Sequence, residues 1–329
     1  MTKHLSTILC AALFAGAACF SVPTAQAGSC CGGGTGATLF LPKNADSMVN
    51  LSFDMEKYDG FWTNEGKYFH DQPGTDLRQY RMNAGYALRL APRWQASVAL
   101  PYIWNENKYS GLFSRTEGLG DTTFNLWYEA FDSVMCRWKY FDIEDLKPAA
   151  SFGLSLTVPT GVSPYDNVSS SFDITGRGFY RVDGNILLEQ TIFPWSASLF
   201  MSYGKYIERP VDRENGVYVE PYRKRLGDRT VGTLMISYVD YLDIRDSRNT
   251  MIYTAAASEV WEGRSTINGE PDPTSGFKKT SVAGTVAYGT LDRTWIVQLS
   301  WNHSIMTDNW GYNFPASNIY SAGVTHVFK

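Results

Sequence analysis

Residues 118–130 read GLGDTTFNLWYEA, residues 149–161 read AASFGLSLTVPTG, and residues 176–192 read GRGFYRVDGNILLEQTI. Apolar and polar side chains alternate in all three stretches, so each predicts a β-strand with one apolar and one polar face. A strand buried in a protein core reads instead as a continuous apolar run. We therefore expect three neighbouring strands whose apolar faces contact lipid.

The same alternation recurs along most of the remaining chain. No stretch of comparable length shows the 3.6-residue period of an amphipathic helix, except part of 132–147. The sequence predicts about twelve strands, at 48–57, 76–90, 93–104, 118–130, 149–159, 176–192, 195–206, 226–241, 249–261, 277–290, 294–305 and 317–328.

The connections between these strands alternate in length. Short turns at one end and long loops at the other are typical of outer-membrane barrels, in which the short turns and both termini face the periplasm. The connection at 131–148 is longer than the others on the short-turn side. The short connections are Ala91-Pro92, Phe193-Pro194, 242–248 and 291–293, and the long ones are 58–75, 105–117, 161–175, 207–225, 262–276 and 306–316.

The apolar faces carry aromatic residues at their ends. On 195–204 the apolar set begins with Trp195 and ends with Tyr203, and amphipathic rings suit the headgroup zone of a membrane. An open sheet edge in lipid would leave backbone groups unpaired, so the sheet must close. The sequence thus predicts an all-β fold: a closed antiparallel transmembrane β-barrel of about twelve strands, with short periplasmic turns and long extracellular loops.

Composition and the first residues indicate a secreted protein. The chain has 329 residues, 44% of them hydrophobic, and a net charge of −4, which argues against nucleic acid as a partner. Residues 1–27 combine Lys3, an apolar run and Ala25-Gln26-Ala27, the pattern of a cleaved signal peptide. We expect a flexible periplasmic segment at 28–47 and an outer-membrane barrel at 48–329.

Three cysteines remain after cleavage of the signal: Cys30, Cys31 and Cys136. One hypothesis is a disulfide between Cys136 and one of the adjacent pair. The alternatives are lipidation of Cys30 and a flexible tail with free thiols. The spacing of Cys and His fits neither a zinc site nor a haem attachment site, so we expect no metal and no cofactor.

Three short motifs occur in order on this alternating background: Gly118-Leu-Gly-Asp121, Pro159-Thr-Gly161 and Gly176-x-Gly178. In these motifs the chain resembles the outer-membrane "transporter" family named for the MetA pathway of phenol degradation. The resemblance implies a barrel that passes small, often aromatic or hydrophobic solutes. The adjacent cysteines and the 131–148 connection are not part of the family pattern.

Two interpretations of the motif residues stay open. Glycine relieves steric limits where a loop meets a strand, and aspartate accepts hydrogen bonds from turn amides, so the motifs can be structural. Alternatively they form a loop clamp near the outer mouth. The residues concerned are Gly118, Gly120, Asp121, Pro159, Gly161, Gly176 and Gly178.

Charged and amide residues on the polar faces are the candidates for the lumen. They either bond to one another inside the barrel, or form a constriction in which Arg81, Arg177 or Arg181 selects polar or anionic solutes. The candidates are Arg81, Arg89, Asp121, Asn125, Glu129, Arg177, Arg181, Asp183, Asn185 and Glu189.

An enzyme is not expected. A barrel hydrolase needs a Ser and a His on one face of a strand, whereas Ser304 directly follows His303 and so lies on the opposite face. His303 shares the apolar face of Trp301.

The function that follows is passive passage of small, hydrophobic or aromatic solutes through an outer-membrane channel. The alternative is a non-conducting barrel that binds a periplasmic partner through 28–36 and 131–148. A third reading is a soluble secreted all-β protein. The expected partners of a barrel are outer-membrane lipid, the solute and the assembly machinery, for which the last strand ends in Phe328-Lys329.

Overall fold

The computed structural model describes residues 39–42, 45–62, 67–109, 111–131, 147–168, 173–192, 194–241, 249–290, 294–305 and 314–329. The predicted signal peptide at 1–27, the cysteines Cys30, Cys31 and Cys136, and most of the 131–148 connection lie outside these ranges. Within them no helix is long and apolar enough to cross a membrane.

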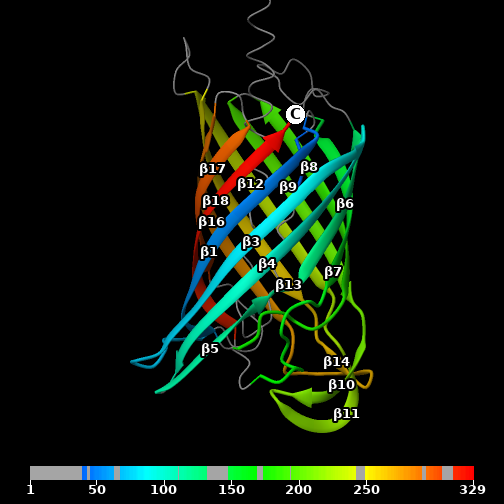
Figure 1. The fold of residues 1–329 in the computed structure, drawn as a ribbon, viewed down its shortest axis with the longest axis vertical. Helices are drawn as coiled ribbons and strands as arrows, with labels where there is room; N and C mark the ends of the chain where they lie inside the picture. The colour runs from blue at the N-terminus through cyan, green and yellow to red at the C-terminus, as the bar shows by residue number, and fades with distance from the viewer. Residues whose placement is uncertain are drawn as a thin grey trace, which may run out of the picture.

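Antiparallel strands form a closed barrel (Figure 1), and the pairing of the last strand with the first closes it. Neighbours in the sequence are neighbours in the barrel, so every connection is a hairpin. In order around the wall the strands are β1 (Ser47–Trp62), β3 (Asp76–Ala91), β4 (Trp94–Tyr109), β6 (Thr122–Phe131), β7 (Ala149–Val158), β8 (Arg181–Ile192), β9 (Trp195–Tyr206), β12 (Arg229–Tyr241), β13 (Thr250–Glu262), β16 (Phe277–Gly289), β17 (Trp295–Ile305) and β18 (Phe314–Phe328).

These twelve strands correspond one to one with the predicted strands. Three of the predicted starts are too early, because the chain leaves the wall at the glycine motifs. The predicted strands at 118–130, 176–192 and 226–241 join the barrel only at Thr122, Arg181 and Arg229.

The long connections were predicted as polar loops, but the structure shows that several of them contain short strands. β5 (Leu112–Leu119) returns along β4 beyond the barrel, and β2 (Tyr68–Phe69) pairs with β1. A second, small sheet outside the barrel contains β10 (Arg209–Glu214), β11 (Val217–Arg225), β14 (Thr266–Ile267) and β15 (Glu270–Pro271).

Two Asn-Gly pairs explain the small sheet. Asn215 and Gly216 have φ of 47° and 79°, and Asn268 and Gly269 have φ of 50° and 89°. Two successive positive φ values are characteristic of a type I′ turn, the commonest two-residue hairpin turn. Asn-Gly between short polar strands was therefore a usable hairpin signal, and it was missed.

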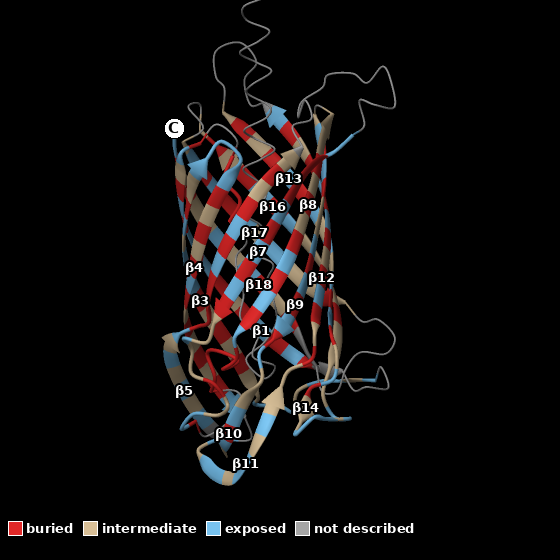
Figure 2. Ribbon diagram, turned by 90° about the vertical axis from the view of Figure 1, so that its right-hand side faces the viewer, coloured by how far each residue is buried: buried red, intermediate tan, exposed pale blue. Residues whose placement is uncertain are grey.

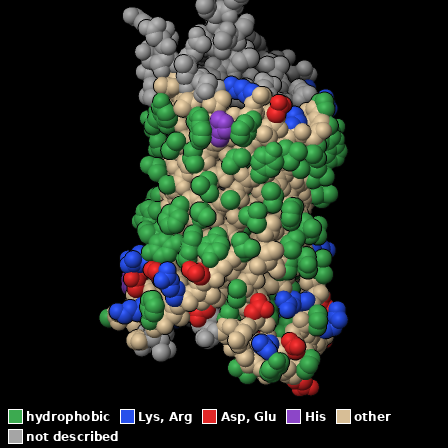
Figure 3. Space-filling view, viewed as in Figure 1, with side chains coloured by type: hydrophobic (Ala, Val, Ile, Leu, Met, Phe, Trp, Pro, Cys, Tyr) green, Lys and Arg blue, Asp and Glu red, His purple; other side chains and the backbone are tan. Residues whose placement is uncertain are grey.

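The predicted assignment of the two faces is confirmed (Figure 2). Leu126, Phe152 and Leu299 face outward and are 38%, 45% and 62% exposed, respectively. Arg81 and Gln298 face inward and are 0% and 6% exposed. Hydrophobic side chains form a band around the middle of the visible wall, and charged ones gather towards its ends (Figure 3).

Aromatic pairs mark the limits of this band. At the short-turn end Trp195 lies 5.0 Å from Tyr238 and Trp295 lies 4.3 Å from His326, measured between ring centroids. Trp94 and Trp104 occupy the outer face of β4, ten residues apart. At about 3.3 Å per residue and a tilt of about 40°, that spacing corresponds to a band of about 25 Å, the usual apolar height of an outer-membrane barrel.

Candidate functional site

The lumen is lined unevenly, and one sector of its wall carries small hydroxyl side chains. We call this the hydroxyl sector. Its members bond to one another, as in Thr233–Ser258 at 2.9 Å and Ser237–Thr254 at 2.8 Å, so they lie along the wall. It comprises Ser196, Ser198 and Ser202 on β9, Thr233 and Ser237 on β12, Thr254 and Ser258 on β13, and Ser281 and Thr285 on β16.

The opposite sector carries charge, and Arg81 of β3 is its centre. Arg81 Nη1 lies 2.9 Å from Glu56 Oε2, and Arg81 Nε lies 3.6 Å from Asp54 Oδ2. The side chain is fully buried. A buried guanidinium requires such partners, so Arg81 joins β1 to β3 along the wall.

The two amide candidates, Asn125 and Asn185, belong to a hydrogen-bonded ladder across four strands. Asn125 donates to Ser97 Oγ at 3.1 Å and accepts from Ser155 Oγ at 2.6 Å. Asn185 in turn donates to Ser155 Oγ at 2.6 Å. The first two bonds join register partners on β4, β6 and β7, and the third runs diagonally from β8 to β7, so the ladder stabilises the pairing of the strands.

At the long-loop end, Asp121 fastens the loop between β7 and β8. Its Oδ1 accepts the backbone N–H of Gly161 at 3.2 Å, and its Oδ2 accepts that of Arg177 at 2.7 Å. A Cβ on Gly176 would lie 2.2 Å from Asp121 Oδ1, so only glycine fits there. Burial raises the pKa of the Asp121 carboxyl, and the two amide donors act in the opposite direction.

The other motif residues surround this bond. Thr160 Oγ donates to the carbonyl of Gly120 at 2.5 Å, and Thr175 Oγ donates to that of Leu119 at 2.6 Å. Gly178 has a φ of 77°, where a side chain would be strained. A Cβ on Gly118 would lie 3.7 Å from its nearest neighbouring atom, which is an ordinary van der Waals contact. The packing therefore does not require glycine at 118. Pro159 directly follows the last residue of β7.

Residues 173–177, which we call the strap, cross the lumen. At one side Asp173 Oδ1 accepts from Ser114 Oγ at 2.7 Å, and the Ile174 carbonyl accepts from Asn105 of β4 at 2.9 Å. At the other side Arg177 binds Glu262, the last residue of β13, with both of its terminal nitrogens. Five strands separate β4 from β13 in either direction around the barrel, so the strap joins opposite walls.

The predicted strand at 176–192 implied that Arg177 lies on the barrel wall, and this was wrong, because β8 begins only at Arg181. It precedes β8 and enters the lumen from the loop because Asp121 holds its backbone. Arg181, the first residue of β8, does line the wall, and its Nε lies 2.8 Å from Asp183 Oδ1. Arg229 Nη1 also reaches Glu262 Oε2 at 3.3 Å, and Arg181 Nη1 donates to the Tyr206 hydroxyl at 3.1 Å. Neither Glu262 nor Tyr206 was among the predicted site residues.

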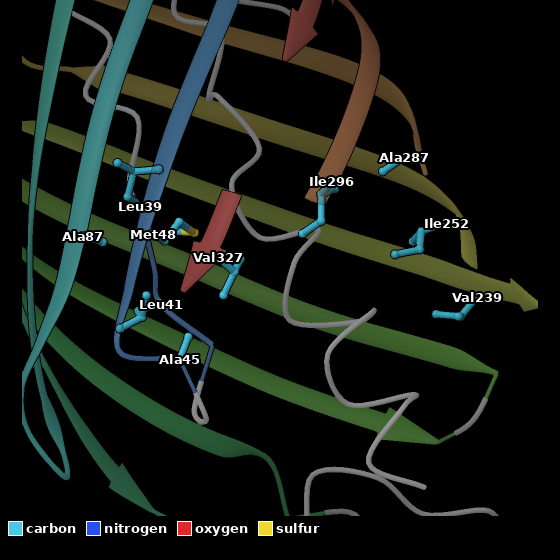
Figure 4. Packing of buried hydrophobic residues seen from close by; sticks show 10 residues of the cluster. All are labelled: Leu39, Leu41, Ala45, Met48, Ala87, Val239, Ile252, Ala287, Ile296 and Val327. Atoms are coloured by element: carbon cyan, nitrogen blue, oxygen red, sulfur yellow. The ribbon is translucent and has the colours of Figure 1, made fainter. Parts of the chain in front are cut away.

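The short-turn end of the lumen is apolar and is occupied by the start of the described chain. Leu39, Leu41 and Ala45 are buried there and belong to one hydrophobic cluster with residues of seven strands (Figure 4). The wall residues are Met48, Ala87, Val239, Ile252, Ala287, Ile296 and Val327. Residues 39–42 and 45 fall within the segment at 28–47 that we expected to be flexible, and Leu39, Leu41 and Ala45 pack against the inner wall.

Arg89 and Gln95 hold this segment by its backbone. Arg89 donates to the carbonyls of Pro42 and Ala45 at 2.9 and 3.1 Å, and Gln95 Oε1 accepts the N–H of Leu41. Glu129 orients both, since its Oε1 accepts from Arg89 and from Gln95 at 2.9 Å. The sequence feature that could have predicted a buried N-terminal segment is the apolar run Leu39-Phe40-Leu41, which follows the Gly-rich start. Glu189 is buried on the inner wall of β8 near the same end.

His303 lies on the outer face, as predicted. Its ring stacks on Trp301 at 5.7 Å, and its Nδ1 lies 2.9 Å from Asn318 Oδ1. Ser304 points to the interior and is buried. Among the described residues there is no group of three or more His, Cys, Asp or Glu placed to hold a metal ion.

No protein-family model matches the sequence, and no curated protein matches it. Solved structures do. The COG4313 outer membrane channel from Pseudomonas putida F1 matches with a TM-score of 0.65 at 14% identity, over 88% of this chain and 97% of that one. The β domain of the Bordetella autotransporter BrkA matches with a TM-score of 0.49 at 12% identity, over 87% of this chain and all of that one.

The fold is that of an outer-membrane barrel. The closed wall, the apolar band and the two aromatic limits place the chain in the outer membrane, with lipid around its outer face.

Proposed function

We propose that the protein is an outer-membrane channel that passes small solutes, hydrophobic and aromatic ones among them, by passive diffusion. The hydroxyl sector carries this proposal. Over four adjacent strands the inward side chains are mostly Ser, Thr, Ala and Gly, and these are too small to fill the interior. A twelve-stranded barrel is wider than the eight-stranded kind that side chains fill, so a route for a small molecule lies beside this sector.

Two further observations support the proposal. The P. putida structure of the same fold is described as an outer membrane channel. The glycine motifs that resemble the MetA-named family fasten the strap across the lumen here. Selection in such a channel comes from the width and the polarity of the lumen and needs no covalent step, so we propose no enzymatic activity.

The proposed route is narrowed at both ends. The strap crosses it at the long-loop end, and Leu39, Leu41 and Ala45 occupy it at the short-turn end. The strap is held by hydrogen bonds and by the ion pair of Arg177 with Glu262, and the N-terminal segment by backbone hydrogen bonds and apolar contacts. Neither is part of the hydrogen-bonded strands of the wall, so each can move without breaking the barrel. Passage of a solute accordingly requires displacement of both segments.

Bilayer conductance and liposome uptake test the channel directly. The matched pair is Thr254→Trp and Ala255→Trp, because these neighbours on β13 face the lumen and the lipid, respectively. A channel beside the hydroxyl sector predicts that Thr254→Trp lowers the conductance and the uptake while Ala255→Trp leaves both unchanged. A wild-type barrel that neither conducts nor admits solutes would support the non-conducting platform instead.

The finer partner assignments remain proposals. We propose that the barrel is inserted by the outer-membrane assembly machinery, consistent with the terminal aromatic Phe328 on β18. A periplasmic partner at 28–36 and 131–148 and a disulfide among Cys30, Cys31 and Cys136 remain predictions, since those segments fall outside the described ranges apart from Phe131, Lys147 and Pro148.

A further inference from the structure

Trp127 is the largest fully buried side chain of the chain's described part, and it lies inside the lumen on β6. Its indole covers Gly153 of the neighbouring strand. A Cβ on Gly153 would lie 2.7 Å from two atoms of the indole ring. Glycine at 153 therefore provides the space in which this large ring lies along the wall.

The indole nitrogen of Trp127 is buried and has no hydrogen-bond partner among the described residues. An indole N–H is a donor only, and a buried one is usually paired. Because unpaired buried donors are rare in native proteins, this one requires an explanation. A ligand that brings its own acceptor supplies one.

The surroundings of Trp127 define the rest of the site. Leu187 and Phe200, which pair across β8 and β9, belong to the same apolar cluster. Phe200 lies 6.5 Å from the indole, between ring centroids. These three side chains come from the wall and form an apolar, aromatic surface within an otherwise polar stretch of the lumen.

A phenyl group already occupies this surface. Phe40 meets Trp127 edge to face, with ring centroids 5.4 Å apart and planes at 88°, a favoured geometry for aromatic pairs. Phe40 does not belong to the wall. It comes from the segment that Gln95 and Arg89 hold by backbone bonds.

We propose that Trp127, Leu187 and Phe200 form a binding site for one small, neutral aromatic molecule that carries an oxygen acceptor, and that Phe40 fills this site when no ligand is bound. The proposal deepens the proposed channel function and rests on it for its biological meaning. A ligand ring that replaces Phe40 keeps the contact with Trp127. Its oxygen also accepts the indole N–H, and a phenyl group has no such oxygen acceptor.

Binding of the ligand is thereby coupled to release of the N-terminal segment. The ligand binds only the fraction of molecules from which Phe40 has withdrawn, so its apparent affinity is reduced by that fraction. Removal of the Phe40 ring removes the competition. An aromatic solute would thus promote the withdrawal of the segment that narrows its own route.

Calorimetric titration of the detergent-solubilised full-length protein tests the site with two matched probes. Acetophenone carries a carbonyl acceptor, and α-methylstyrene replaces that carbonyl by a methylene group of similar shape. We expect Phe40→Ala and the milder Phe40→Leu to bind acetophenone roughly fivefold or more tightly than wild type, as relief of such a competition predicts. We expect Trp127→Phe, which keeps a ring but loses the donor, to abolish the preference for acetophenone over α-methylstyrene.

Trp104→Phe, on the outer face of β4, is the matched control and should behave as wild type. Equal affinities of wild type and both Phe40 variants would overturn the competition, and an unchanged preference in Trp127→Phe would overturn the role of the indole. Binding is measured without transport, so the two proposals fail separately. Conductance without binding refutes only the site, and binding without conductance refutes only the channel.

Discussion

Asp121 accepts the backbone N–H of Arg177 at 2.7 Å, and the side chain of the same Arg177 binds Glu262 on the other side of the barrel. One residue thus connects the glycine motifs to the opposite wall. The motif aspartate positions the backbone, and the guanidinium makes the distant contact.

Replacement of Asp121 by Asn should release the strap. A carboxamide has one acceptor oxygen where the carboxylate has two, so one of the two amide donors loses its partner, at a cost of about 1–3 kcal/mol. We expect faster hydrogen exchange at the amides of Gly161 and Arg177, and a larger unit conductance. Asp212→Asn, at an exposed position of β10, should change neither.

Replacement of Gly176 by Ala should destabilise the folded barrel. The new Cβ would lie 2.2 Å from Asp121 Oδ1, and overpacking of this kind costs about 1–3 kcal/mol. Thermal unfolding followed by electrophoretic mobility measures the effect. Gly184→Ala is the control, since its Cβ would have no neighbour within 4 Å. Equal losses in both variants would contradict the packing argument.

Replacement of Glu262 by Gln should be more damaging than the loss of an exposed ion pair. It leaves the buried guanidinium groups of Arg177 and Arg229 without their shared carboxylate, which costs about 3–5 kcal/mol. Breaking the exposed pair Arg223–Glu208 should cost about 0–1 kcal/mol. Urea unfolding of the barrel in liposomes compares the two, and a small effect of Glu262→Gln would mean that water reaches the strap.

The prediction of the strands succeeded because the membrane imposes a two-residue period on each of them. On β6, for example, the alternation alone places Leu126 on the lipid face and Asn125 on the lumen face. Parity also places Trp127 inside, next to Asn125 and Glu129, although it was not among the predicted lumen residues. The apolar inner wall at the short-turn end breaks the expectation of a polar lumen, because Met48, Ile252 and Val327 contact the chain's own N-terminal segment.

The position of the strap was not predictable from local sequence. Arg177 continues the alternation of its strand, and only the contact of its backbone with Asp121, 56 residues earlier, removes it from the wall. The contact with Glu262 lies still further away in the sequence. Such pairings depend on the closure of the barrel, which no single segment encodes.

A charge on the outer face should hinder insertion. Leu299 faces lipid near the middle of β17, and an arginine at such a position costs about 2–4 kcal/mol. Folding of Leu299→Arg into phospholipid vesicles should therefore be less favourable by that amount. Phe113→Arg, on the exposed β5 beyond the barrel, should fold like wild type.

The strap also has a mechanical consequence. The hydrogen bonds between the strands fix the circumference of the barrel. They do not by themselves fix the shape of its cross-section, which lateral pressure from the bilayer could flatten into an ellipse. The link from Asn105 to Glu262 fixes one diameter of the rim by covalent bonds and buried contacts. The residues that obstruct the mouth are thus also those that keep it round, and loosening them would change the shape of the opening together with its size.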